Sequence, residues 1–203
     1  MKNIIFLLIF GSCMANELFD QIADLYDTYG GEKYMIGEEI TQKQHALQAA
    51  FLAFKDHQSE EMIVALLLHD IGQIVQKKSL GEKSFLDFSH DEIGYDWLKK
   101  NHFSDFVCDF AKYHTLAKVI LCEKDPEYFN TLSWASKESF VIQKKKFLSD
   151  QKIIEEFLSH RQLDALLECR RFDDLAKESE LDEKKGLLDF TFYKDMITNQ
   201  IKK

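Results

Sequence analysis

Apolar residues recur at three- and four-residue steps along most of the chain, which is the spacing of helices with one buried face. The segment from Leu18 to Tyr29 shows this pattern clearly, and Gly30-Gly31 is expected to end it. The sequence contains no long alternation of apolar and polar residues that would indicate a strand, and no internal repeat. The pattern predicts an all-helical chain, with helices over residues 18–29, 41–57 and 60–68, from 90, over 104–114, from 126, and over 163–177 and 187–201.

Polar residues mark where several of these helices begin and where the chain turns. Thr41 and Gln44 have the spacing of a capping box. A polar stretch over residues 77–82, with Ser79 and Gly81 as helix breakers, predicts a loop. Three further helix starts are indicated by capping residues or by an initial proline, at Ser89 with Glu92, at Ser104 and at Asp125-Pro126.

The composition fits a single folded domain, which we place at residues 16–203. Hydrophobic residues make up 45% of the 203-residue chain and aromatic residues 13%, which is enough for a buried core. The formal net charge of −9 argues against nucleic acids and anionic membranes as partners, because a basic surface supplies most of the affinity for both. A small anionic substrate would need a local basic pocket. The four cysteines form no C-x-x-C pair, so reduced thiols in a cytoplasmic protein are expected.

Residues 1–15 form a separate segment with two interpretations. Lys2 precedes an apolar run over residues 4–10, and Gly11-Ser12-Cys13 follows it, as in a short signal peptide of an exported protein. The run is too short to span a bilayer. The alternative is a misassigned leader with the true start at Met14, which agrees better with a cytoplasmic enzyme.

The stretch Leu66-Leu67-Leu68-His69-Asp70-Ile71-Gly72 brings an apolar helix end directly to an imidazole and a carboxylate. The leucines are expected to be buried, and the polar pair beside them is costly to bury unless something compensates it. A metal ion would do so, because it takes a neutral ring nitrogen and an anionic oxygen together. The alternative is a single hydrogen bond between His69 and Asp70 at a helix end.

Further histidines and one aspartate are placed around this pair along the chain. Side chains from separate helices of a bundle can converge at one point in the core, so these residues are candidate metal ligands. For any one of them alone, the alternative is an ordinary core or surface side chain with satisfied hydrogen bonds, and we expect that role for His57, His102 and His160. The candidate ligands are His45, His69, Asp70, His90, His114 and Asp173.

The order His, His-Asp, His, His, Asp resembles the metal signature of the HD-domain superfamily. From about Tyr26 to Lys177 the chain also resembles the HD-domain mixed-valent diiron oxygenases. The resemblance is closer to the member that cleaves 2-amino-1-hydroxyethylphosphonate and more distant to myo-inositol oxygenase, and it implies an all-α HD-domain helical bundle. It rests on residues 37–48, His69-Asp70-Ile71-Gly72, His90 with Gly94 and Leu98, residues 114–118, residues 132–136 and Arg170-Arg171-Phe172-Asp173-Asp174.

The resemblance implies a non-haem centre of two irons, Fe(II) and Fe(III), with O2 as cosubstrate. It implies catalytic roles for Asp70, Glu38 and Tyr34, with Asp70 bridging the two irons. The other ligands would divide into two sets, His45, His69 and Asp173 at one iron and His90 and His114 at the other. Imidazole and carboxylate ligands suit iron and leave positions for substrate and oxygen.

The resemblance also implies the substrate and the residues that hold it. The phosphonate would be bound by Lys118, Ser136 and Arg170. Lys118 lies one helical turn after His114, so it can face the same metal. The implied reaction is oxidative cleavage of the carbon–phosphorus bond of a small 1-hydroxyphosphonate, either 2-amino-1-hydroxyethylphosphonate or an N-substituted analogue, to phosphate and a carboxylic acid.

This chain departs from the family pattern at three places. The segment from Tyr34 to Glu38 has one more residue than expected between the tyrosine that caps the open iron site and the Gly-Glu pair. Gln73 stands where closer relatives have a substrate-binding histidine, and a neutral amide cannot carry charge. Gln143-Lys144-Lys145 stands in place of Gln-Gly-Gly. These changes point to a substrate with a different or methylated amino end.

Two other functions use the same residues. An HD-domain phosphohydrolase acting on a nucleotide or phosphate ester would activate a metal-bound water with the same His-Asp core. Residues 37–38, Lys118 and Arg170 match the oxygenases instead. A helical interaction module that has kept the HD fold is disfavoured by the intact ligand set.

Overall fold

The computed structural model describes residues 2–34, 38–80, 89–181 and 186–202. Within these ranges the only extended pairings are two isolated bridges, Lys33 with Thr41 and Phe103 with Ile201, so the predicted all-α fold is confirmed. The helices are α1 (Lys2–Tyr29), α2 (Gln42–Lys55), α3 (Glu60–Leu68), α4 (Ile71–Leu80), α5 (His90–Lys100), α6 (Asp105–Lys124), α7 (Pro126–Thr131), α8 (Trp134–Leu148), α9 (Gln151–Leu158), α10 (Leu163–Leu175), a 3₁₀ helix (Phe190–Tyr193) and α11 (Lys194–Asn199).

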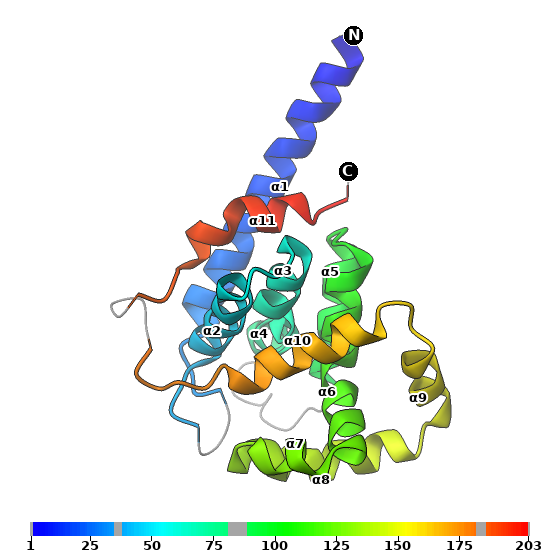
Figure 1. Cartoon of the computed structure of the whole chain (residues 1–203). Coiled ribbons are helices and arrows are strands. Elements are labelled where there is room, and N and C mark those ends of the chain that lie inside the picture. Colours follow the sequence, from blue (N-terminus) through cyan, green and yellow to red (C-terminus); the bar gives the residue numbers. More distant parts are fainter. Residues whose placement is uncertain (1, 35–37, 81–88, 182–185, 203) are drawn as a thin grey trace.

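Helix α6 is central to the bundle and packs against α3, α5, α8 and α10 (Figure 1). Its residues from Thr115 to Cys122 are all buried, as are those of α3 from Ile63 to Leu68. Helix α1 packs against α4 and α11, and its N-terminal part extends beyond the other helices (Figure 1). The core therefore lies around α3 and α6. Helix α3 ends directly before the His-Asp pair, and α6 carries His114.

Several sequence predictions of helix boundaries are confirmed. Thr41 and Gln44 form the capping box at the start of α2. The helix expected over 60–68 matches α3, and Pro126 begins α7. The structure also leaves all four cysteines free, as predicted.

Other boundaries were wrong. The expected loop over residues 77–82 is helical as far as Leu80, where α4 ends, and residues 81–82 lie outside the described chain. The helix expected to end near His114 continues to Lys124. Its second half is buried on all sides, so the sequence there lacks the apolar periodicity of a half-buried helix, and the prediction stopped too early. The expected helix over 187–201 is a 3₁₀ helix followed by the short α11. Helices α4, α8 and α9 were not predicted.

The start of α5 is stabilised differently from the prediction. Ser89 is the N-cap residue, but its side chain makes no capping hydrogen bond. The backbone amide of Glu92 instead donates to Oδ1 of Asp91 at 3.0 Å. The helix begins at His90 as predicted, and Asp91 rather than Ser89 satisfies an amide of its first turn.

The N-terminal segment is part of α1, which begins at Lys2 and runs unbroken to Tyr29. Within the described ranges, no helix combines the length and the apolar run that a bilayer crossing requires. The two interpretations of residues 1–15 and the placement of one domain at 16–203 stay predictions.

Gly72 allows α4 and α5 to approach at the point where the His-Asp pair meets His90. A Cβ atom at Gly72 would lie 1.9 Å from the carbonyl oxygen of His90 and 2.7 Å from the backbone nitrogen of Gly94. Both neighbours are backbone atoms, so no side-chain rotation could relieve the overlap. A residue without a side chain at this position is therefore what lets His90 lie beside Asp70.

We expect Gly72→Ala to destabilise the fold and to disturb the site, because the two helices must move apart. The free energy of unfolding should fall by about 1–3 kcal/mol, as for other overpacked positions. Bound metal should fall with it, since His90 moves away from Asp70. Gly31→Ala is the control, because nothing lies within 4 Å of the Cβ position there. Chemical unfolding and elemental analysis of both variants test the prediction, and equal stability of the two would contradict it.

Candidate metal centre

Six candidate ligands from five parts of the bundle converge in the core. His69 and Asp70 lie between α3 and α4, and the leucines before them are fully buried, as predicted. The other four come from the faces or ends of four helices. They are His45 on α2, His90 at the start of α5, His114 in the middle of α6 and Asp173 on α10.

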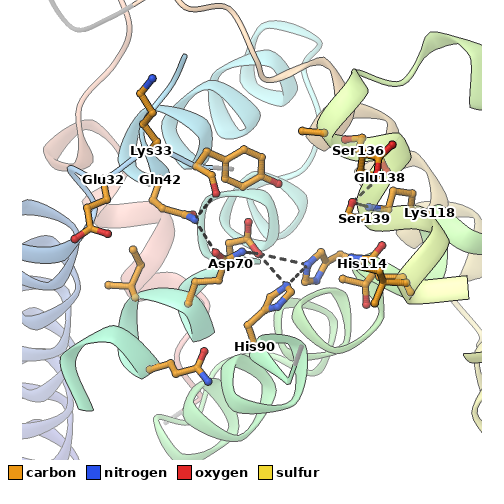
Figure 2. A pocket seen from close by; sticks show the side chains of 18 of the residues that line it. Glu32, Lys33, Gln42, Asp70, His90, His114, Lys118, Ser136, Glu138 and Ser139 are labelled. Atoms are coloured by element: carbon orange, nitrogen blue, oxygen red, sulfur yellow. Dashed lines mark hydrogen bonds and ion pairs between the residues drawn. The ribbon is translucent and has the colours of Figure 1, made fainter. Parts of the chain in front are cut away.

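The carboxylate of Asp70 belongs to two groups of candidate ligands, one with His45 and His69 and one with His90 and His114. Figure 2 shows the side of Asp70 that faces His90 and His114. Its Oδ1 atom is 3.4 Å from Nε2 of both His90 and His114. Its Oδ2 atom is 3.4 Å from Nε2 of His69 and 4.0 Å from Nε2 of His45. One oxygen therefore faces each group, which is the arrangement that a carboxylate bridging two cations requires.

Asp173 completes the group that contains His45 and His69. Its Oδ1 is 3.1 Å from Nε2 of His45, and its Oδ2 is 3.4 Å from Nε2 of His69. We call His45, His69 and Asp173 the enclosed ligand set, because all three are fully buried. His90 and His114 form the cavity-facing ligand set, because both line a cavity described below.

Hydrogen bonds to backbone carbonyls fix the tautomer of three imidazoles. Nδ1 of His45 donates to the carbonyl oxygen of Ala176 at 2.9 Å. Nδ1 of His69 donates to that of Leu66 at 2.7 Å, and Nδ1 of His114 donates to that of Ala111 at 2.8 Å. A neutral ring that donates from Nδ1 leaves a lone pair on Nε2. Partners of this kind orient the imidazoles of metal sites.

The donor set fits metal cations, because the lone pairs and charges in it are otherwise uncompensated. Nε2 of His45 and Nε2 of His69 are only 3.2 Å apart. Two unprotonated nitrogens at that distance repel each other unless a cation lies beside them. Oδ2 of Asp70 and Oδ1 of Asp173 are also buried without a hydrogen-bond partner. Such atoms are costly to bury, and metal coordination removes the cost.

The charge states of His69, Asp70 and Asp173 agree with metal binding. Burial lowers the pKa of the His69 imidazole to about 4, so the ring is neutral at neutral pH. Burial opposes ionisation of Asp70, but the surrounding imidazoles outweigh it and hold the pKa of that carboxyl well below its ordinary value. Arg170 and the imidazoles do the same for the pKa of Asp173. Neutral rings and ionised carboxylates are the forms that bind metal ions.

A cavity of about 520 Å³ opens onto one side of the centre and leaves the other closed. Among the described residues, Asp70, His90 and His114 line it, whereas His45, His69 and Asp173 do not. A small molecule in the cavity would therefore reach the cavity-facing ligand set. This set also contributes fewer protein ligands, which leaves more coordination positions for a substrate.

The part of the cavity wall beside His114 carries Lys118 and two serines (Figure 2). Lys118 is buried, and its Nζ donates to Oγ of Ser139 at 2.8 Å. Ser136 is also buried, and its Oγ accepts a hydrogen bond from Nζ of Lys177 at 2.5 Å. Burial, followed by the charge of Arg170, lowers the pKa of Lys118 to about 7. No carboxylate in the described part of the chain pairs with Lys118, and a buried ammonium of this kind favours an anion in the adjacent cavity.

Arg170 connects the cavity to the enclosed ligand set. Its Nη1 donates to Oδ2 of Asp173 at 2.5 Å, and its Nε donates to Oδ2 of Asp174 at 3.1 Å. Asp174 also accepts hydrogen bonds from Nη2 of Arg170 and from the hydroxyl of Tyr128 on α7. The guanidinium is thus held in one orientation at the cavity edge, with donors left over for a ligand.

Gln73 and Tyr34 both line the cavity. Nε2 of Gln73 donates to Oδ1 of Asp70 at 3.0 Å, and its Oε1 accepts from Nε2 of Gln42 at 2.6 Å. The Tyr34 ring stacks on the ring of His45, with 3.8 Å between their centroids. The extra residue predicted between Tyr34 and Glu38 lies in a segment, residues 35–37, outside the described chain.

Glu38 lies apart from the metal ligands. Its Oε1 accepts a hydrogen bond from Oγ of Ser133 at 2.6 Å and lies 3.8 Å from Nζ of Lys177. It does not line the cavity within the described residues. Its catalytic role stays a prediction, and the structure connects it to Ser136 through Lys177.

The remaining histidines have the ordinary roles expected of them. His57 and His102 are exposed, and His160 pairs with Asp109 at 3.2 Å. Sequence reasoning missed Gln42, Ser139 and the functional position of Lys177. Lys177 lies just beyond α10, which ends at Leu175, so no helical spacing from Asp173 marked its position in the sequence.

Comparisons with known proteins give the family of the chain. The profile of the HD domain matches residues 36–168. The chain is 34% identical over 162 residues to the [1-hydroxy-2-(trimethylamino)ethyl]phosphonate dioxygenase (glycine-betaine-forming) of Leisingera caerulea, covering 79% of this chain and 81% of the relative. It is 36% identical over 163 residues to the hydroxymethylphosphonate dioxygenase of Gimesia maris, covering 79% of each.

The chain belongs to the HD-domain phosphonate oxygenase family. The family inferred from the motifs is thus confirmed, and the protein is an oxygenase of the HD superfamily. The chain is also 31% identical over 177 residues to the uncharacterised protein L432 of Acanthamoeba polyphaga mimivirus, covering 83% of this chain and 80% of that protein. In this oxygenase, Asp173 and Arg170 lie beyond the matched HD segment, so the domain profile does not account for them.

Proposed function

We propose that this oxygenase holds two irons and cleaves the carbon–phosphorus bond of a small 1-hydroxyphosphonate with O2. The observation that carries the proposal is the position of Asp70, whose two oxygens face separate ligand sets, one of them beside a cavity that contains Lys118. The two named relatives act on 1-hydroxyphosphonates, with and without a trimethylamino group. The substrates we propose are 2-amino-1-hydroxyethylphosphonate and its N-substituted analogues.

The protein residues would divide the work between metal binding and substrate binding. Asp70 would bridge, with the enclosed set at one iron and the cavity-facing set at the other. When bound, the irons supply Lewis acidity and the redox chemistry with O2. Lys118, Ser136 and Arg170 would orient the phosphonate through charge-assisted hydrogen bonds. Gln73 would hold the rest of the substrate from the Asp70 side of the cavity.

Oxygen uptake and phosphate release, measured together, test this function. The reaction R–CH(OH)–PO₃²⁻ + O2 gives a carboxylic acid and phosphate, so O2 takes all four electrons from the substrate and no other reductant is needed. We expect one O2 consumed for each phosphate released from 2-amino-1-hydroxyethylphosphonate, its N-trimethyl analogue or hydroxymethylphosphonate. Phosphate release from phosphate esters without oxygen uptake would show the phosphohydrolase function instead.

The metal content should approach two irons per chain in protein grown with iron. Alanine at both His90 and His114 should reduce it to one, since the enclosed ligand set keeps its three side chains and Asp70. Elemental analysis of the purified proteins measures both values. A wild-type content that stays at one, with the double variant unchanged, would remove the two-iron proposal.

Gln73→His should change the preference among substrates without changing the iron content. The side chain lines the cavity but is not a candidate ligand, and histidine can carry a charge that the amide cannot. Rates for 2-amino-1-hydroxyethylphosphonate and its N-trimethyl analogue, compared in both proteins, give the ratio. An unchanged ratio would mean that Gln73 does not contact the amino end of the substrate.

A further inference from the structure

Among the described residues, no backbone carbonyl accepts a hydrogen bond from the ring of His90, whereas one orients each of the other three imidazoles. His69 and His114 each donate from Nδ1 to a carbonyl three residues earlier, and His45 donates to the carbonyl of Ala176. His90 is the first residue of α5. Within the described residues, its ring makes a hydrogen bond only with His114. The position of His90 therefore depends on what fixes the start of α5.

Asp91, the next residue, is bound to two neighbouring helices. Its side chain is buried, with 2% of the residue exposed. Oδ2 accepts a hydrogen bond from Oγ1 of Thr115 on α6 at 2.9 Å. Nζ of Lys146 on α8 lies 3.2 Å from Oδ1 and 3.1 Å from Oδ2. Oδ1 also accepts from the amide of Glu92, which ties the carboxylate to its own helix.

The partners of Asp91 belong to elements that build the site. Thr115 directly follows His114, so its hydrogen bond joins the chain at His90 to the chain at His114. Lys146 is on the helix that carries Ser136 and Ser139 on the cavity wall. Asp91 thus meets α6 and α8 at one buried point, and movement of α5 alone would break these contacts.

The charge of Asp91 makes this arrangement specific. A buried carboxylate is costly unless it is paired and hydrogen-bonded, and here the cation and the hydroxyl together provide both. The ammonium of Lys146 lies within 3.2 Å of both oxygens of Asp91, so the negative charge is paired where it is buried. If α5 were placed differently relative to α6 and α8, the carboxylate of Asp91 would lose these partners. A buried polar cluster can specify one arrangement of helices in this way.

We propose that Asp91 is a positioning residue, which holds His90 beside His114 through Thr115 and Lys146 and so sets the metal affinity of the cavity-facing ligand set. The inference rests on the two-metal centre proposed above. It assigns to Asp91 no contact with substrate or metal. The enclosed ligand set shares none of these contacts, so its affinity should not depend on Asp91.

Metal affinities of the two sites in Asp91 variants test the inference. Protein is dialysed against graded Fe(II) without oxygen, and bound iron is measured by elemental analysis. In Asp91→Ala the second equivalent should bind about 10- to 100-fold more weakly than in wild type, as for other supporting partners of metal ligands, while the first is unchanged. Asp91→Asn, which keeps a carbonyl oxygen for Thr115 but loses the charge, should show a smaller loss and serves if the alanine variant does not fold.

The control is Asp105→Ala, at the opposite end of the same two helices. Asp105 on α6 pairs with Lys99 on α5 at 2.6 Å, so its removal weakens the contact between α5 and α6 far from His90. It should leave both iron affinities unchanged. Asp91 variants with a lower melting temperature but two unchanged affinities would overturn the inference. A wild-type protein that binds one iron would overturn the two-metal centre itself.

Discussion

Asp70→Ala is expected to lose both bound metal and all measurable activity. Oδ1 and Oδ2 of this carboxylate are the oxygens that face the two ligand sets, and no other carboxylate among the described candidates lies between them. Without it, the cavity-facing set keeps two neutral imidazoles and no negative charge. We expect the metal content to fall below one per chain and the rate to fall by more than about three orders of magnitude, because the loss removes the metal-dependent chemistry itself.

Asp70→Asn separates charge from shape in this test. It retains an oxygen but cannot ionise, so it should bind metal better than the alanine variant and still be inactive. Both variants should fold, because Oδ2 of Asp70 is buried without a hydrogen-bond partner, and such an atom contributes little to the stability of the metal-free protein. Elemental analysis, circular dichroism and oxygen uptake of both proteins provide the measurements. Two metals bound by Asp70→Ala would show that Asp70 is not the bridge.

Lys118→Met is expected to weaken substrate binding while stabilising the ligand-free protein. Within the described residues, the ammonium is hydrogen-bonded to Ser139 and has no carboxylate partner. Loss of a buried charge-assisted contact costs about 2–5 kcal/mol, which corresponds to about 30- to 5,000-fold in the dissociation constant of the phosphonate. Methionine fills similar space without a charge to bury, so the melting temperature should rise. The iron content should stay as in wild type.

The pH dependence of Lys118 gives a second measurement of the same residue. Its pKa is lowered to about 7, against about 10.4 for an unfolded lysine. Between these values the unfolded chain binds the extra proton, so the ligand-free protein should gain stability as pH rises from about 7 to 10. Affinity for sulfate, whose charge is constant over this range, should fall at the same time. Both trends should be smaller in Lys118→Met, and identical curves would exclude Lys118 as the anion site.

The sequence predicted those parts of the fold and site that depend on short-range pattern. The capping box of Thr41 and Gln44 and the helix over 60–68 are local features, and local hydrogen bonds decide them. The ligands were found because the order of their residue types resembles that of a known family. Helix α4 was not predicted because its C-terminal half, with Lys77, is polar and has the composition of a loop. The packing of α1 and α5 against it is not visible in the local sequence.

The supporting contacts of the site could not be predicted, because their partners are remote in sequence. Asp91 and Lys146 are 55 residues apart, and Glu38 and Ser133 are 95 apart. Each of these residues taken alone is an ordinary polar position on a helix or loop. Only the packing of α5, α6 and α8 brings Lys146 to Asp91, and no periodicity in the sequence contains that information.

The unequal access to the two ligand sets has a consequence for preparing the protein. Exchange with solvent should be faster at His90 and His114, which line the cavity, than at His45, His69 and Asp173, which do not. A brief treatment with a small chelator should therefore yield a half-loaded protein rather than a mixture of full and empty chains. Adding a different divalent ion afterwards would give a heterobimetallic centre with each element at a known position, suitable for assigning spectroscopic signals to one site at a time.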